Sequence, residues 1–209
     1  MKKVFPLLGA LLVLVLPACK APARYSPAQT GTASVPAAKS DSRNTADIAA
    51  VTALTEILTS KNDNDTRLDT AFNNLSPSAK TLFRDKYRTL APEDRNGRGT
   101  IVYLLGKNLK DETDWAFLRE VVSEPICLSL ADCAVPAEMT EEHNETGMAV
   151  TLAYPALVAL KQAENTIAAN KAAPDSFAVT QAWTVIEAAK LSKSGKVASV
   201  AARLQILLK

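Results

Sequence analysis

The chain contains a single histidine, His143, which is the first residue that could do acid–base or metal chemistry. It lies in the acidic stretch Glu141-Glu142-His143-Asn144-Glu145. A zinc site needs three or four ligands that converge on the metal, and neither a polar loop nor one helix face brings these side chains together. We therefore predict a solvated acidic segment and no metal site. Glu142 and His143 are kept only as the first residues to test if the protein is an enzyme.

Carboxylates near residue 111 form a second candidate. Asp111, Glu112 and Asp114 could cleave a sugar polymer if one acid lay in an apolar pocket, about 5–9 Å from a second. Acids at this spacing are more typical of a helix start, where they suit the positive end of the helix dipole. We predict that they begin a helix.

The stretch Asp63-Asn64-Asp65 suggests a calcium site, but the residues that follow do not fit one. In an EF-hand loop, a ligand is required where Arg67 stands, and a glycine should follow that ligand. Both requirements fail in this sequence. We predict instead that Asn64 or Asp65 caps a helix.

The segment Arg95-Asn96-Gly97-Arg98-Gly99 is the most interesting of these elements. Two glycines cost a helix roughly 1 kcal/mol each, so we predict an exposed turn before an apolar helix at 101–109. Arg95, Arg98 and the glycine backbone could hold a phosphate, a carboxylate or a protein partner there. The Walker lysine and its spacing are absent, which argues against a nucleotide site. A plain interhelical turn is the alternative.

The N-terminus has the features of an export signal. Lys2 and Lys3 precede an apolar run from Leu7 to Leu16, which is shorter than the roughly 20 residues that span a bilayer. The run ends in Leu16-Pro17-Ala18-Cys19, which resembles the lipobox of bacterial lipoproteins, with Pro17 in place of the usual alanine or serine. The resemblance implies that residues 1–18 are a signal peptide and that Cys19 becomes the lipid-bearing N-terminus. An ordinary secretory signal with a chance cysteine is the alternative.

Lipidation of Cys19 would fix the protein to a membrane, since two or more acyl chains give stable attachment where one does not. Lys20, not aspartate, follows the cysteine. By the sorting rule of lipoproteins, this implies the outer membrane. We therefore expect a membrane-anchored, periplasm-facing protein whose partners are membrane lipid, through Cys19, and another envelope protein.

Cys127 and Cys133 remain as a pair once Cys19 carries lipid. In an oxidising compartment, such a pair is expected to form a disulfide. Closing this seven-residue loop stabilises the fold by about 2.4 kcal/mol in the loop-entropy model. A redox pair is disfavoured because Cys-x-x-Cys spacing is absent.

The composition of the mature chain argues against binding to nucleic acid. Removal of residues 1–18 takes two lysines from the 24 Lys+Arg, which leaves 22 against 22 Asp+Glu and indicates no basic surface. Residues 20–44 are rich in Ala, Pro, Ser and Thr and cannot bury enough apolar surface to offset their ordering entropy. We predict three parts: the signal peptide 1–18, the lipidated cysteine with a disordered tether at 19–44, and one domain at 45–209.

Helical periodicity runs through residues 45–209. Apolar residues at three- and four-residue steps predict helices over 45–60, 65–75, 101–109, 146–170 and 195–208. Further helices start at Ser76-Pro77, with Leu82 on the apolar face, and near 111 and 175. Pro155 should bend the helix 146–170 or mark its true start. We predict an all-α domain with Trp115 and Trp183 in the core, or lining a groove.

One part of this domain resembles a HEAT-type repeat. An apolar helix, Thr100–Gly106, ends in Leu-Gly, and a second, Asp114–Val122, has an aspartate near its start. The resemblance implies short antiparallel helix pairs in a HEAT-like α-solenoid. No second copy follows at a period of about 40 residues, and an irregular helical bundle is the alternative.

These features favour a non-enzymatic lipoprotein that acts as an adaptor or scaffold. Stacked helix pairs present surfaces suited to protein partners, with Arg95, Arg98 and the loop from Cys127 to Cys133 as the candidate contacts. No cofactor is predicted. One alternative is an enzyme acting on peptidoglycan or a related envelope polymer. Another is a carrier of lipid or another apolar ligand, which would need a pocket of several hundred Å3.

Overall fold

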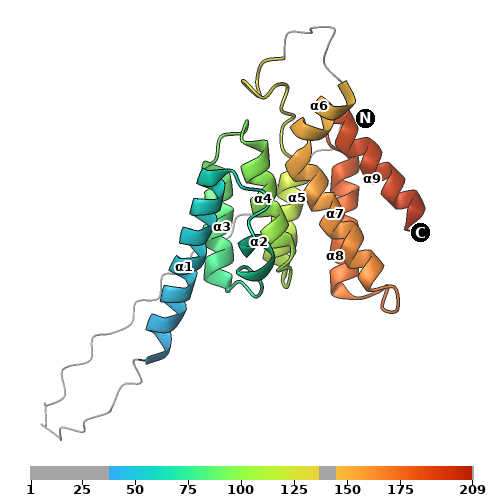
Figure 1. Ribbon diagram of the computed structural model, residues 1–209. Coiled ribbons are helices and arrows are strands. Elements are labelled where there is room, and N and C mark those ends of the chain that lie inside the picture. Colours follow the sequence, from blue (N-terminus) through green and yellow to red (C-terminus); the bar gives the residue numbers. More distant parts are fainter. Residues whose placement is uncertain (1–37, 137–144, 209) are drawn as a thin grey trace, which may run out of the picture. The chain divides into compact units, whose positions relative to one another are not determined.

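The computed structural model describes residues 38–136 and 145–208, which form helices joined by loops (Figure 1). No β-strand occurs within these two ranges. The prediction of an all-α fold is therefore confirmed. The predicted signal peptide, Cys19 and residues 20–37 of the predicted tether lie outside the described residues, as do Glu142 and His143.

Most helices begin at capping residues that the sequence supplies. Ser76, Ser176 and Ser194 each accept a hydrogen bond from the backbone N–H three residues later, which pairs a donor that a first helical turn leaves unsatisfied. Asp111 and Asp114 form a capping box. The helices of the described residues are α1 (Ala38–Ser60), α2 (Arg67–Thr70), α3 (Pro77–Thr89), α4 (Arg95–Gly106), α5 (Glu112–Val122), α6 (Glu145–Leu152), α7 (Tyr154–Ala169), α8 (Phe177–Lys190) and α9 (Gly195–Leu207).

Some helix boundaries differ from the prediction. Helix α1 begins at Ala38 rather than at 45, so it includes the end of the predicted tether. The helix predicted at 65–75 contains only the short α2, which is followed by turns. Pro155 marks a true start, since α6 ends at Leu152 and Pro155 lies in the first turn of α7. Proline is tolerated there because the first N–H groups of a helix have no intrahelical partner.

The predicted turn at 95–99 is wrong, because α4 already begins at Arg95. The carboxylate of Asp94 accepts the backbone N–H of Gly97 at 3.0 Å and so caps the first turn. Gly97 and Gly99 therefore lie inside a helix, despite the intrinsic cost of glycine in that position.

Close packing against α7 explains why α4 tolerates glycine. A Cβ atom added at Gly99 would overlap the ring of Tyr154, and one added at Gly106 would overlap the side chain of Gln162. The two glycines are about two helical turns apart and so lie on one face of α4. Their missing side chains let α4 and α7 approach closely, which sequence periodicity alone does not reveal.

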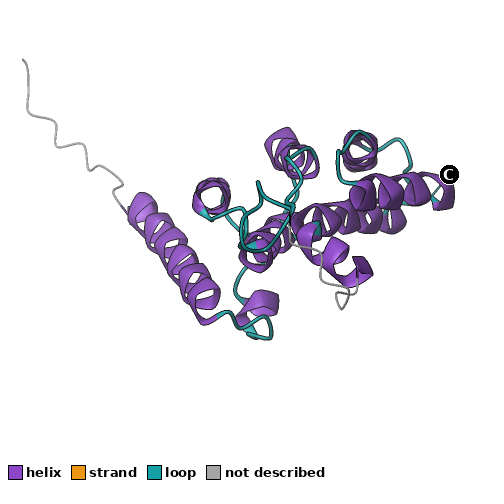
Figure 2. Cartoon of the chain, turned by 90° about the horizontal axis from the view of Figure 1, so that it is seen from above, coloured by secondary structure: helices purple, strands orange, loops and turns teal. Residues whose placement is uncertain are grey.

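In the described part of the chain, the helix pair α4 and α5 packs against the helix pair α7 and α8. Helix α4 packs on α7, and α5 packs on α8 and α7 (Figure 1). Seen from above, the described residues are helices and loops (Figure 2). Helix α3 packs on α4 and on α1, and α9 packs on α8 and α7. Stacked pairs are the unit that a solenoid repeats. Both a HEAT-like solenoid and an irregular helical bundle are compatible with this packing.

One of the two tryptophans lies entirely within the core. Trp115 of α5 is 1% exposed, as predicted, whereas Trp183 of α8 is only half-buried. Leu82, predicted on the apolar face of α3, is exposed instead. Lys80 and Arg84 lie on the buried face of that helix together with Phe83 and Tyr87.

Candidate functional site

An open groove of about 520 Å3 lies where α1, α4, α6 and the loop after α5 meet. Its apolar part comes from Ile57 and Leu58 of α1 and from Leu130 of the loop. Its polar part includes Lys61, Asp63 and the residues that begin α4. The groove is therefore built from segments far apart in the sequence.

Arg95, the first residue of α4, lines this groove and is buried, with 7% of its surface exposed. Its Nη1 donates to the carbonyl oxygen of Pro92 at 3.1 Å, but its buried Nε has no hydrogen-bond partner. Among the described residues, no carboxylate oxygen lies within 4.0 Å of its guanidinium nitrogens. Burial lowers the pKa of Arg95, because removal from water disfavours the charged form. Glu124 and Glu93 act on this pKa in the opposite direction, but neither forms an ion pair with Arg95.

Arg98, one turn later, forms the ion pair that Arg95 lacks. Its Nη2 lies 2.5 Å from Oε1 of Glu124, and its guanidinium stacks 4.0 Å from the ring centre of Tyr87. Burial and the nearby Glu124 raise the pKa of Tyr87, whose hydroxyl has no hydrogen-bond partner. The two guanidinium groups thus lie near two carboxylates, Glu124 and Glu93, and the ion pair that the described residues form here joins Arg98 to Glu124.

The expected exposure of Arg95 and Arg98 is wrong, since both are buried. Both belong to the first turn of α4 and are among the buried residues of that helix. Of the two, only Arg95 lines the groove.

The cysteine pair forms the predicted disulfide. Cys127 and Cys133 are bonded, with their Cα atoms 4.1 Å apart. The backbone N–H of Cys133 donates to Oε1 of Glu93 at 2.7 Å, which joins the loop to the start of α4. This N–H lowers the pKa of Glu93, and the charges of Arg95 and Arg98 act in the same direction. The loop places Leu130 on the groove, so the structure brings together Arg95 and the disulfide loop, two contacts proposed separately from the sequence.

The carboxylates that line the groove are already engaged. Asp94 caps α4, and Glu93 accepts the N–H of Cys133. Asp63 accepts a hydrogen bond from the side-chain amide of Asn96 at 3.4 Å. Each of the three acids therefore has a hydrogen-bond partner within the chain, and none of them forms an ion pair with Arg95.

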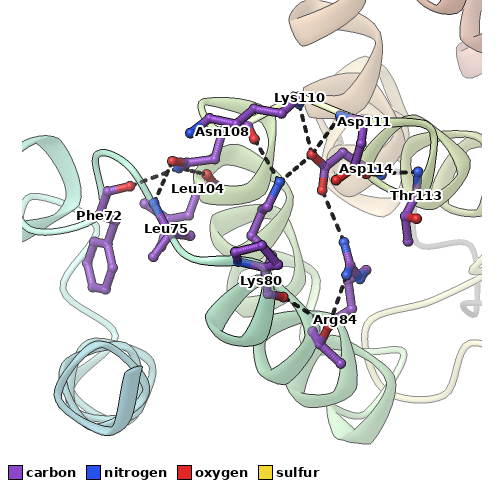
Figure 3. Close-up of polar contacts among 12 residues, drawn as sticks. Phe72, Leu75, Lys80, Arg84, Leu104, Asn108, Lys110, Asp111, Thr113 and Asp114 are labelled. Atoms are coloured by element: carbon purple, nitrogen blue, oxygen red, sulfur yellow. Dashed lines mark hydrogen bonds and ion pairs between the residues drawn. The ribbon is translucent and has the colours of Figure 1, made fainter. Parts of the chain in front are cut away.

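The acids at the start of α5 have structural roles. Asp111 accepts the backbone N–H groups of Thr113 and Asp114, which confirms the predicted helix start. Asp114, however, is also buried and forms ion pairs with Lys80 and Arg84 of α3 (Figure 3). A carboxylate held in this way does not fit the role of a glycosidase acid.

Sequence reasoning missed this buried ion pair. Lys80 and Arg84 are four residues apart and share a face with Phe83 and Tyr87, which are buried. The sequence did indicate this arrangement, because Lys80 and Arg84 occur at the same three- and four-residue steps as the core side chains of α3.

The predicted cap at Asn64 or Asp65 is wrong, because the N-cap of α2 is Thr66, which makes no side-chain capping bond. Asp65 lies directly before that N-cap. Its Oδ1 accepts the backbone N–H of Arg67 at 2.9 Å, and the same carboxylate binds the Arg67 guanidinium. Both contacts lower the pKa of Asp65. Within residues 38–136 and 145–208, no group of three or more His, Cys, Asp or Glu side chains could hold a metal ion.

No protein-family model, curated protein or solved structure matches this chain. The helices of the described residues include none that is both long and apolar enough to cross a membrane.

Proposed function

We propose that this chain is an envelope lipoprotein, anchored through Cys19 and sorted to the outer membrane, whose helical domain binds another protein. The proposed anchor rests on Leu16-Pro17-Ala18-Cys19 and on Lys20. The proposed binding surface is the groove formed by α1, α4, α6 and the disulfide loop.

One observation carries the binding proposal: Arg95 is a buried cation that forms no ion pair with the described residues, and it lines an open groove beside Ile57 and Leu58. A buried charge costs free energy unless it is paired and hydrogen-bonded. Proteins retain such costly groups mainly at functional sites. A partner that covers the groove would bury Ile57, Leu58 and Leu130 beside this cation.

Photo-crosslinking tests whether the groove binds a protein. A photoreactive residue at Leu130, on the groove wall, is compared with the same residue at Leu82 on α3. The two leucines are equally exposed, each at 43%, so accidental collisions affect both. We expect one defined protein adduct from position 130 in living cells, weakened at least tenfold by Arg95→Met. Adducts of equal yield from both positions would contradict a specific groove interaction.

The anchor requires a separate test. Metabolic labelling with an alkyne analogue of palmitate should label the wild-type protein and leave Cys19→Ala unlabelled. Labelling of both forms would show that Cys19 does not carry the lipid.

A carrier of an apolar ligand is favoured by one feature, the groove volume of about 520 Å3, which lies in the range of ligand pockets. The groove is open, however, and would leave one side of an acyl chain in water. A protein partner covers that side with its own surface, so we prefer the protein-binding proposal.

A further inference from the structure

We infer that the outer face of α9, with the turn before it, docks on an anionic phospholipid surface. This basic apolar face is formed by Leu191, Lys193, Lys196, Arg203, Ile206 and Leu207. None of these residues lines the proposed protein-binding groove. The inference therefore goes beyond the proposed function and does not depend on it.

The apolar side chains of this face are largely open to solvent. Leu191, Ile206 and Leu207 are 85%, 79% and 69% exposed, the highest values among the large apolar side chains that the structure describes. Helix α9 packs on α8 and α7 (Figure 1), and its buried side carries Val197 and Leu204. Single exposed apolar residues are ordinary on a protein surface. Three on one short segment, with the highest exposures, indicate a surface that another apolar medium covers.

The charge of the same segment has one sign. Residues 188–209 contain five Lys or Arg residues and no Asp or Glu, although the whole chain has a net charge of only +2. Lys190 pairs with Glu187 of α8 at 2.8 Å. Lys193, Lys196 and Arg203 form no ion pair with any described residue. These three cations give the face a local positive charge, which attracts an anionic partner.

The acid that lies beside this face does not cancel its charge. Glu124 lines a hollow of about 330 Å3 together with Leu191 and Lys193. Its carboxylate is paired with the guanidinium of Arg98 at 2.5 Å. The hollow leaves the start of the face accessible to a headgroup.

A phospholipid surface matches both properties of the face. Interfacial protein segments place apolar side chains at the acyl boundary while Lys and Arg contact anionic headgroups, and the long basic side chains reach those headgroups from an apolar stem. Each cation near such a surface strengthens binding by about fivefold, so three cations together strengthen it by about a hundredfold. A nucleic acid would leave Leu191, Ile206 and Leu207 in water, and an apolar protein groove would bury the cations without counter-ions.

The test uses the full-length chain reconstituted into vesicles, with a fluorescent amino acid either at Ala202, exposed on α9, or at Leu82, exposed on α3. The vesicles contain phosphatidylcholine alone or phosphatidylcholine with anionic phosphatidylglycerol. Brominated acyl chains in both quench a fluorophore that reaches the acyl boundary. We expect quenching at position 202 that requires phosphatidylglycerol, and none at position 82. The readout is local to α9, so it does not depend on how the N-terminus is attached.

Two charge variants show whether this face is responsible. The first replaces its three unpaired cations: Lys193→Gln, Lys196→Gln and Arg203→Gln. The control removes the same charge from lysines elsewhere that also form no ion pair with the described residues: Lys86→Gln, Lys110→Gln and Lys171→Gln. The first variant should lose the quenching at position 202, and the control should keep it. Circular dichroism of both variants should equal that of wild type, because no printed contact of the fold is removed.

Four results would overturn the inference. Equal quenching at position 202 with and without phosphatidylglycerol would mean that the cations do not select the surface. Equal loss in the two charge variants would indicate a general attraction of the whole chain. Absence of quenching at position 202 in all vesicles would place α9 away from lipid. A photoreactive residue at Ala202 that gave a defined protein adduct in cells, without quenching on vesicles, would assign the face to a protein partner.

The crosslinking experiment at Leu130 reads the groove separately. A defined adduct at position 130 without quenching at position 202 would retain the proposed function and reject docking of α9 on lipid. Quenching at position 202 without a specific adduct at position 130 would retain the lipid-docking face and reject the groove as a protein-binding surface.

Discussion

Lys80 of α3 forms a salt bridge with Asp114 of α5, and their side chains are only 2% and 3% exposed. The same ammonium group donates to the carbonyl oxygen of Asn108 at 3.2 Å. The Asp114 carboxylate also binds Arg84 at 3.2 Å and the backbone N–H of Lys110 at 2.8 Å. One carboxylate thus joins α3, the turn after α4, and the start of α5 (Figure 3).

Replacement of Asp114 by alanine should strongly destabilise the fold. The variant leaves the Lys80 ammonium buried without its counter-ion, and breaking a buried pair in this way costs about 3–5 kcal/mol. Glu120→Ala is the matched control, because Glu120 pairs with Arg88 at the surface, where a pair contributes about 0–1 kcal/mol. Urea denaturation should separate the two variants clearly. Equal losses would show that the buried pair is not a major determinant of stability.

Replacement of Arg95 by methionine should leave stability unchanged or raise it by about 1 kcal/mol. Methionine fills similar space, and exchange of a buried charge for an apolar side chain is often neutral or stabilising. Chemical denaturation of the ligand-free protein measures the change. A loss of more than about 2 kcal/mol would mean that Arg95 already has a stabilising partner, against the binding role given to it above.

Gly99→Ala should destabilise the protein even though alanine favours helix by about 1 kcal/mol. The added methyl group would overlap the ring of Tyr154, and overpacking costs about 1–3 kcal/mol. The second change Tyr154→Ala should recover part of that loss. Gly195→Ala is the control, because no atom lies within 4 Å of an added Cβ at the start of α9. If both glycine variants gained stability, the close packing of α4 on α7 would be contradicted.

Removal of the disulfide should lower the free energy of unfolding by about 2.4 kcal/mol for this seven-residue loop. It should also weaken binding in the groove, because the loop carries Leu130 and contacts Glu93. The double variant Cys127→Ser, Cys133→Ser is compared with wild type in the presence and absence of a reductant. Reduction should affect the wild type alone. If the affinity of the groove for its partner did not change, the disulfide would not contribute to binding.

The contact between Glu93 and the loop should depend on pH. The Cys133 N–H and the charges of Arg95 and Arg98 lower the folded-state pKa of Glu93 below its ordinary value of 4.5. The resulting stabilisation is present above 4.5 and is lost as the pH falls through the lower, folded-state pKa. The stability difference between wild type and Glu93→Gln should therefore shrink from about pH 6 to about pH 3. A difference independent of pH would show that the charge of Glu93 contributes nothing.

The local features of the fold could be predicted from the sequence. Ser76, Asp111 and Pro155 act on their own helix starts through hydrogen bonds and steric limits within a few residues, so the pattern around them is sufficient. The disulfide could also be predicted, because Cys127 and Cys133 are six residues apart and are the pair that remains once Cys19 is assigned to lipid. The start of α4 was predicted wrongly from its glycines, because the carboxylate of Asp94 caps the helix and close packing on Tyr154 leaves no room for a side chain at position 99.

The sequence by itself determined the helical class, most helix starts and the cysteine pairing, and its first twenty residues are the basis of the proposed lipid anchor. Only the tertiary structure decided that Arg95 is buried, that it lines a groove with Leu130, and that Lys80 pairs with Asp114. The physical reason is distance along the chain. Caps and periodicity act within a turn or two, whereas burial and ion pairing depend on helices that meet only after the chain has folded.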